Sequence, residues 1–190
     1  MVRGETGITF CEAPRPIAKE ETVSSKARTL TFSAILVLLT LPAFGQSGPR
    51  TTAQSVRGHF ASVNRRILTM AKDFPDDKYD FKLKPEMRTF GAVIVHIASG
   101  NVYAAKAGRG ENVQWDELDP KDYPNKTAVV ALMEKSIADA EATLKSVPDA
   151  ALSKSVEPWI SVIEHSAEHY GLLVAYYRAN GLVPPESRPK

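Results

Sequence analysis

Hydrophobic positions recur at helical spacing in four stretches of the chain. In the first stretch they follow one another at intervals of three or four residues, as on one face of a helix: Val56, Phe60, Val63, Ile67 and Met70. The other stretches show the same period, or are apolar almost all round, with glycine and proline between them. We therefore expect helices over roughly 51–72, 85–107, 126–147 and 156–180.

Proline, serine and glycine mark the expected helix ends. Pro85 is typical of a first helical residue, and Ser155 is a favourable N-cap for the last helix. Gly181 supplies the residue that commonly ends a helix. The charged, proline-containing stretches 73–84 and 111–125 are expected to be loops. No stretch alternates convincingly with period two, so the pattern predicts an all-α, antiparallel four-helix bundle with up-down order.

An apolar run precedes this domain. Residues 30–41 are mostly apolar, Lys26 and Arg28 lie before them, and the small residues Ala43 and Gly45 follow. This layout is typical of a secretory signal peptide. The run is shorter than the roughly 20 apolar residues that span a bilayer. A buried helix or an uncleaved anchor is the alternative interpretation.

The leader divides the chain into two parts. We expect residues 1–45 to be an N-terminal extension with a signal peptide, and residues 46–190 to be the bundle domain. The polar, patternless start suggests that translation begins at Val23; a genuine extension is the alternative. Cleavage near Gly45 would export the protein to the periplasm or the medium, with no stable membrane anchor. The only cysteine, Cys11, would leave with the leader.

The length and the charge of the chain restrict the classes of partner that we expect. The chain has 190 residues, which is enough for one ordinary domain. Its formal charge is +2, and acidic residues are interspersed among the basic ones. We therefore expect no nucleic-acid partner. A small-molecule substrate and a homodimer are both left open.

Histidines are the candidate functional residues. His165 and His169 are four residues apart on the last predicted helix, so both rings lie on one face. Such a pair alone is more often coincidental or simply hydrogen-bonded. His96 lies within an apolar helix, where a buried imidazole needs a partner. Together the three predict a metal site with an open coordination position, whereas His59 is expected to be an exposed surface residue.

Acidic and polar neighbours offer other interpretations. The sequence from His165 to His169 fits the H-x-x-E-H pattern of one metalloprotease class, with Glu168 as the general base. Such enzymes need a further acidic ligand downstream, and only a short segment follows His169, which argues against a protease. Asn101 and Tyr103 are weak candidates for lining a cleft, and packing is the simpler role for Tyr103.

Two stretches, 78–101 and 164–185, together resemble DinB-like proteins. The resemblance covers about 53–185. It implies a four-helix bundle with three histidine ligands for a divalent metal, usually zinc or nickel. One ligand lies on the second helix and two, spaced by four, lie on the last, which maps them onto His96, His165 and His169.

The resemblance also implies a chemistry. Characterised members of this family are metal-dependent thiol transferases and mycothiol-dependent isomerases, in which the metal activates a thiolate or water. Two hypotheses follow for this chain. One is an exported metal-dependent transferase or hydrolase acting on a small molecule, and the other is a non-catalytic metal- or ligand-binding bundle. The sequence offers no clear general base, so it leaves open whether the protein is an enzyme.

Overall fold

The computed structural model describes residues 49–189. The expected signal peptide, its cleavage point and the alternative start at Val23 all lie outside these residues. The described part contains five α-helices, joined by loops with three short 3-10 turns: α1 (Thr52–Asp73), α2 (Phe90–Gly108), α3 (Lys126–Ser146), the short α4 (Asp149–Lys154) and α5 (Trp159–Ala179). No strand occurs between residues 49 and 189, which confirms the predicted all-α helical bundle.

Two helices begin later than predicted. α2 begins at Phe90 rather than Pro85, because the Thr89 side chain accepts a hydrogen bond from the backbone N–H of Ala92 at 3.1 Å and caps the helix there. α5 begins at Trp159 rather than at residue 156, and Pro158 instead of Ser155 occupies the N-cap position. Ser155 instead ends the unpredicted helix α4, whose Leu152 is buried against the bundle.

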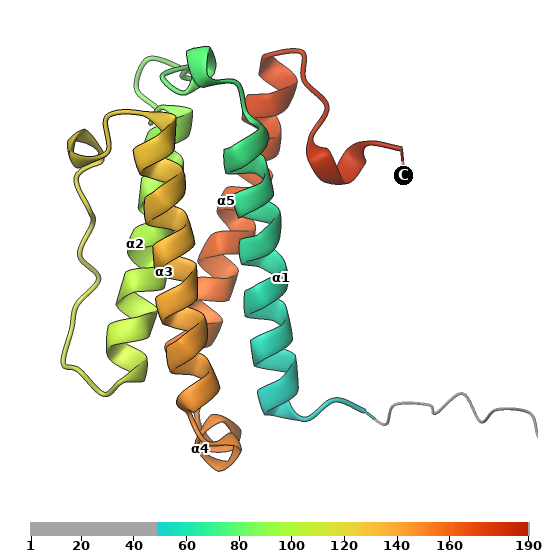
Figure 1. The fold of residues 1–190 in the computed structure, drawn as a ribbon. Coiled ribbons are helices and arrows are strands. Elements are labelled where there is room, and N and C mark those ends of the chain that lie inside the picture. The colour runs from blue at the N-terminus through green and yellow to red at the C-terminus, as the bar shows by residue number, and fades with distance from the viewer. Residues whose placement is uncertain (1–48, 190) are drawn as a thin grey trace, which may run out of the picture. The chain divides into compact units, whose positions relative to one another are not determined.

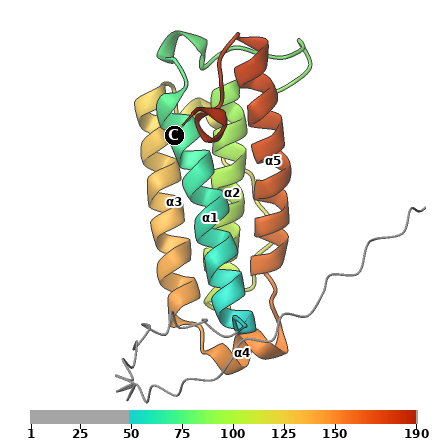
Figure 2. The ribbon, with the colours of Figure 1, turned by 90° about the vertical axis from the view of Figure 1, so that its right-hand side faces the viewer.

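The four long helices form one bundle in which α1 and α5 run in one direction and α2 and α3 in the other (Figures 1 and 2). Lys126, at the start of α3, donates to the carbonyl oxygen of Phe74, just after the end of α1. Arg109, just after α2, reaches Asp139 in the second half of α3. The up-down order that we expected therefore differs at one connection, since α2 and α3 are parallel.

That connection is a long crossover, residues 109–125. It leaves the end of α2, returns along the bundle and reaches the start of α3, which is why the two helices can be parallel (Figure 1). The predicted loop at 111–125 is thus correct, and it covers one side of α2. Its position matters for the site, because α2 carries His96.

The core is apolar, with aromatic clusters towards both ends and a buried pair of asparagines between them. Phe74 and Phe90 stack with ring centroids 3.8 Å apart at one end, and Phe60 packs edge-on against Trp159 at the other. Asn101 is fully buried and donates to Asn64 at 2.9 Å. Its suggested place in a cleft is therefore wrong. Within residues 49–189, no helix combines the length and the apolar character needed to cross a membrane.

Candidate metal centre

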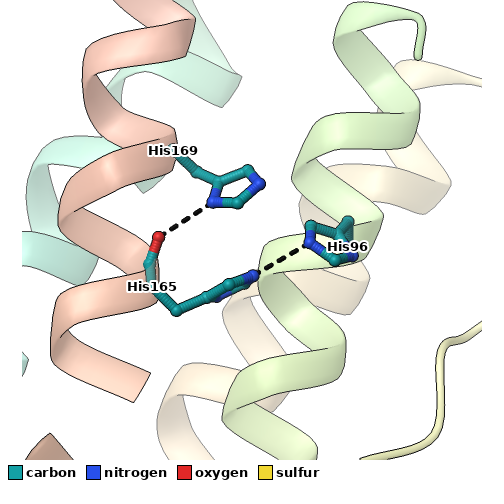
Figure 3. Close-up of side chains that lie close together, drawn as sticks. All are labelled: His96, His165 and His169. Atoms are coloured by element: carbon teal, nitrogen blue, oxygen red, sulfur yellow. Dashed lines mark hydrogen bonds between the residues drawn. The ribbon is translucent and has the colours of Figure 1, made fainter. Parts of the chain in front are cut away.

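Three histidines from two helices meet in the described part of the chain (Figure 3). His96 lies on α2, and His165 and His169 lie one turn apart on α5, which packs against α2. One ring nitrogen from each lies within 4.8 Å of the others, and Nε2 of His96 is 2.9 Å from Nε2 of His165. His59 is exposed on α1, as predicted.

Hydrogen bonds fix which nitrogen faces the cluster. Nδ1 of His96 lies 2.9 Å from Oε1 of Glu117, and Nδ1 of His169 lies 2.9 Å from the carbonyl oxygen of His165. Both oxygens are acceptors, so both Nδ1 atoms carry the hydrogen. In the neutral form of either ring, the lone pair is therefore on Nε2. Nδ1 of His165 is buried without a hydrogen-bond partner.

The surroundings of His96 and His165 favour the neutral form of both rings. Burial, together with the positive charges that His169 and His96 would carry, lowers the pKa of His165 to about 4. Burial also lowers the pKa of His96, helped by the Arg88 guanidinium, although Glu117 acts in the opposite direction. Neutral imidazole is the form that binds a metal ion, so the lowered pKa values favour the ligand form of His96 and His165.

The crossover contributes Glu117, which the sequence did not indicate. Its carboxylate accepts hydrogen bonds from Arg88 Nη2 at 2.8 and 3.1 Å as well as from His96. Burial opposes ionisation of Glu117, but its bonds with Arg88 and His96 outweigh this and lower its pKa. The backbone N–H of Leu118 donates to Ser99 Oγ at 3.0 Å, which attaches this segment to α2.

Trp115, also on the crossover, packs against the cluster. Its ring centroid is 4.7 Å from that of His165 and 5.2 Å from that of Tyr103, so Tyr103 has a packing role. The ring lies directly over Gly100, where an added Cβ would be 2.5 Å from it. Trp115 is nevertheless 37% exposed. It therefore covers one side of the histidines at the boundary with solvent.

On another side, His169 borders a cavity of about 260 Å³. Its walls come from the segment before α2, from α2 itself and from α5: Glu86, Met87, Arg88, Val93, His169, Leu172 and Tyr176. The cavity is large enough for a small molecule beside the cluster. Glu164 and Glu168 are exposed on α5, and neither belongs to the group of potential ligands found among the described residues.

Comparison with protein-family models decides the family. The model of the DinB superfamily matches residues 59–176, more than half of the chain. The chain belongs to the DinB superfamily. No curated protein matches it significantly. The matched region includes the three histidines and Glu117, and it leaves out the N-terminal residues on which the predicted leader lies.

The donor set of this DinB-superfamily chain fits a divalent transition metal. Imidazole nitrogens are ligands that zinc and nickel accept. Two nitrogen ligands of one such ion lie about 3.0–3.4 Å apart when each bond is about 2.1 Å. Nε2 of His96 and Nε2 of His165 are 2.9 Å apart, close to this spacing, and a ring nitrogen of His169 lies within 4.8 Å of the ligand atoms of both. The three histidines could thus hold a metal ion.

Proposed function

We propose that this protein binds one divalent metal ion, zinc or nickel, through His96, His165 and His169. The observation that carries the proposal is the meeting of three imidazoles with one ring nitrogen each inside a 4.8 Å group. The lowered pKa values of His96 and His165 support it, because they favour the ligand form of both rings. Membership of the DinB superfamily supports it independently.

A metal-dependent transferase or hydrolase reaction on a small molecule is the activity that we propose for this site. Three protein ligands leave one coordination position open. A divalent cation bound there would act as a Lewis acid on a substrate atom or on water. Around it, Trp115 excludes water from one side, and the cavity beside His169 gives a small molecule room to approach.

A non-catalytic metal- or ligand-binding bundle is the second candidate. The carboxylate that is hydrogen-bonded to the cluster is already engaged, which favours this candidate. Glu117 is bonded to His96 and Arg88, while Glu164 and Glu168 are exposed. Turnover of small electrophiles by metal-loaded protein, compared with the same protein after chelation, distinguishes the two candidates.

Export completes the proposal. The apolar run at 30–41, the basic residues before it and the small residues at Ala43 and Gly45 support secretion with cleavage near Gly45. N-terminal sequencing of the exported form tests this part. A mature chain that begins at or near Gln46 is the expected result, and finding only full-length protein inside the cell contradicts it.

Metal analysis tests the binding proposal. Protein purified without a nickel column and loaded with zinc should retain about one ion per chain after gel filtration. His165→Ala removes one ligand, so this variant should lose most of the metal. His59→Ala is the matched control and should retain it, because His59 is exposed on a different helix. Equal metal content in both variants would overturn the proposal.

A further inference from the structure

Glu117 lies between a cation and a metal-ligand candidate. Its Oε1 is 2.8 Å from Nη2 of Arg88 and 2.9 Å from Nδ1 of His96. A guanidinium can only donate hydrogen bonds, and an ionised carboxylate can only accept them. The direction of both bonds is therefore determined, and the hydrogen of the neutral His96 ring must be on Nδ1.

The hydrogen on Nδ1 determines what the opposite nitrogen of the His96 ring presents to the cluster. A neutral imidazole carries one N–H, so Nε2 of His96 presents a lone pair towards Nε2 of His165, 2.9 Å away. Without an acceptor at Nδ1, the ring would be free to place its hydrogen on Nε2. That hydrogen would point into the histidine cluster and would have to leave before a cation could bind.

The carboxylate is held in place by its surroundings. Leu118, the next residue, bonds through its backbone N–H to Ser99 Oγ, on α2 within one turn of His96. Arg88, which is bonded to the Glu117 carboxylate, is also held in place, because its backbone carbonyl oxygen accepts a hydrogen bond from the Tyr176 hydroxyl of α5. Acceptor and ring are thus attached to the same helix.

We infer that Glu117 is a positioning residue, which holds His96 as the Nδ1–H tautomer and so directs the Nε2 lone pair to the metal position. Arg88 keeps the carboxylate ionised and oriented. The inference rests on the proposed metal site, since it assigns Glu117 a role towards that ion. A carboxylate behind a ligating histidine typically contributes a factor of about 10–100 to metal affinity.

The first test is made on metal-free protein. Nitrogen-15 NMR of the imidazole rings distinguishes a protonated from an unprotonated ring nitrogen. In the wild type, Nδ1 of His96 should be protonated and Nε2 unprotonated at neutral pH. Glu117→Leu removes the acceptor, so a substantial share of His96 should change to the Nε2–H tautomer. This readout does not depend on whether zinc binds, so it separates the inference from the proposed function.

The second test is zinc affinity, measured by calorimetric titration with Zn²⁺ alone. Glu117→Leu should weaken binding by about 10–100-fold. Glu117→Gln keeps a carbonyl acceptor and should lose less. Glu111→Leu is the matched control, because Glu111 lies on the same crossover and forms a comparable 2.8 Å ion pair with Arg109 away from the histidines. It should leave both the tautomer and the affinity unchanged.

Two results with the leucine variants would overturn the inference. One is a Glu117→Leu protein that remains folded by circular dichroism and keeps His96 in the wild-type tautomer. The other is an equal loss of affinity in the Glu117 and Glu111 variants, which would indicate a general effect of loosening the crossover. If Glu117→Leu does not fold, Glu117→Gln is measured in its place. The inference would then be contradicted by a Glu117→Gln protein that binds zinc as tightly as the wild type although Nδ1 of His96 has no hydrogen-bond partner.

Discussion

Replacing Gly100 by alanine should lift Trp115 away from the histidines. A Cβ at this position would lie 2.5 Å from Cη2 and 3.0 Å from Cζ2 of Trp115, and 3.2 Å from Val162. Carbon atoms pack at about 3.5–4.0 Å, so the tryptophan ring has to move by about 1 Å or more. It can do so, because Trp115 is 37% exposed and lies on the irregular crossover.

The expected change in stability is small, because two effects oppose each other. Alanine gains about 1 kcal/mol of helix propensity over glycine. Exposing about a third of the tryptophan side chain, roughly 60 Å², costs about 1.5 kcal/mol. Gly100→Ala should therefore change the free energy of unfolding by less than about 1 kcal/mol while moving the ring.

Two other helical glycines provide matched controls. A Cβ at Gly171 would meet nothing within 4 Å, so Gly171→Ala should stabilise the protein by up to about 1 kcal/mol. A Cβ at Gly108 would overlap the ring of Trp159, which is 1% exposed and has no room to move. Gly108→Ala should therefore destabilise the protein by about 1–3 kcal/mol.

Urea denaturation and tryptophan fluorescence measure these effects. The chain has two tryptophans, Trp115 and the buried Trp159, so a red shift in Gly100→Ala with unchanged Gly171→Ala emission reports on Trp115. If Gly100→Ala keeps the wild-type emission and is stabilised as much as Gly171→Ala, Trp115 does not pack over Gly100. The reasoning about the crossover would then be refuted.

Two further predictions concern stability. In metal-free protein the folded-state pKa of His165 is about 4, below its value of 6.5 when unfolded, so the unfolded chain binds more protons and stability should fall as the pH drops from about 6.5 to 4. The full pKa shift corresponds to about 3 kcal/mol of stability, which partial exposure of the ring reduces to about 1–2 kcal/mol. Urea titrations of wild type and His165→Gln should show a smaller loss of stability in the variant. An identical loss in both proteins would contradict the role given to His165. Thr89→Ala removes the cap of α2 and should cost about 1 kcal/mol by the same assay, whereas no loss would mean that this cap is unimportant.

The sequence predicted those parts of the molecule that follow from a repeated local pattern. The apolar stripe of α1 and the four-residue spacing of His165 and His169 depend only on helix geometry. Pro85 was misleading, because its preference for a first helical turn competes with the side-chain cap that Thr89 offers four residues later. Helix ends depend on such local competition, which the hydrophobic period does not reveal.

The features that the sequence did not predict depend on contacts between residues far apart in the chain. α2 and α3 are parallel because of the path of the crossover. The crossover has no hydrophobic periodicity, so its sequence does not indicate the direction in which it runs. Glu117 and Trp115 lie 21 and 19 residues after His96, and they reach the histidines only because the crossover returns along α2. The acidic character of this loop was visible in the sequence, but its contact with His96 was not.

The most direct test of the metal site is a crystal structure of zinc-loaded protein with anomalous diffraction measured at the zinc absorption edge. We predict one strong peak, with a nitrogen of His96, His165 and His169 each about 2.0–2.1 Å from it and a fourth position facing away from the three rings. A zinc peak at any other place would contradict the account. So would a zinc-saturated crystal with no peak between the rings, in which Nε2 of His96 and Nε2 of His165 remain hydrogen-bonded to each other.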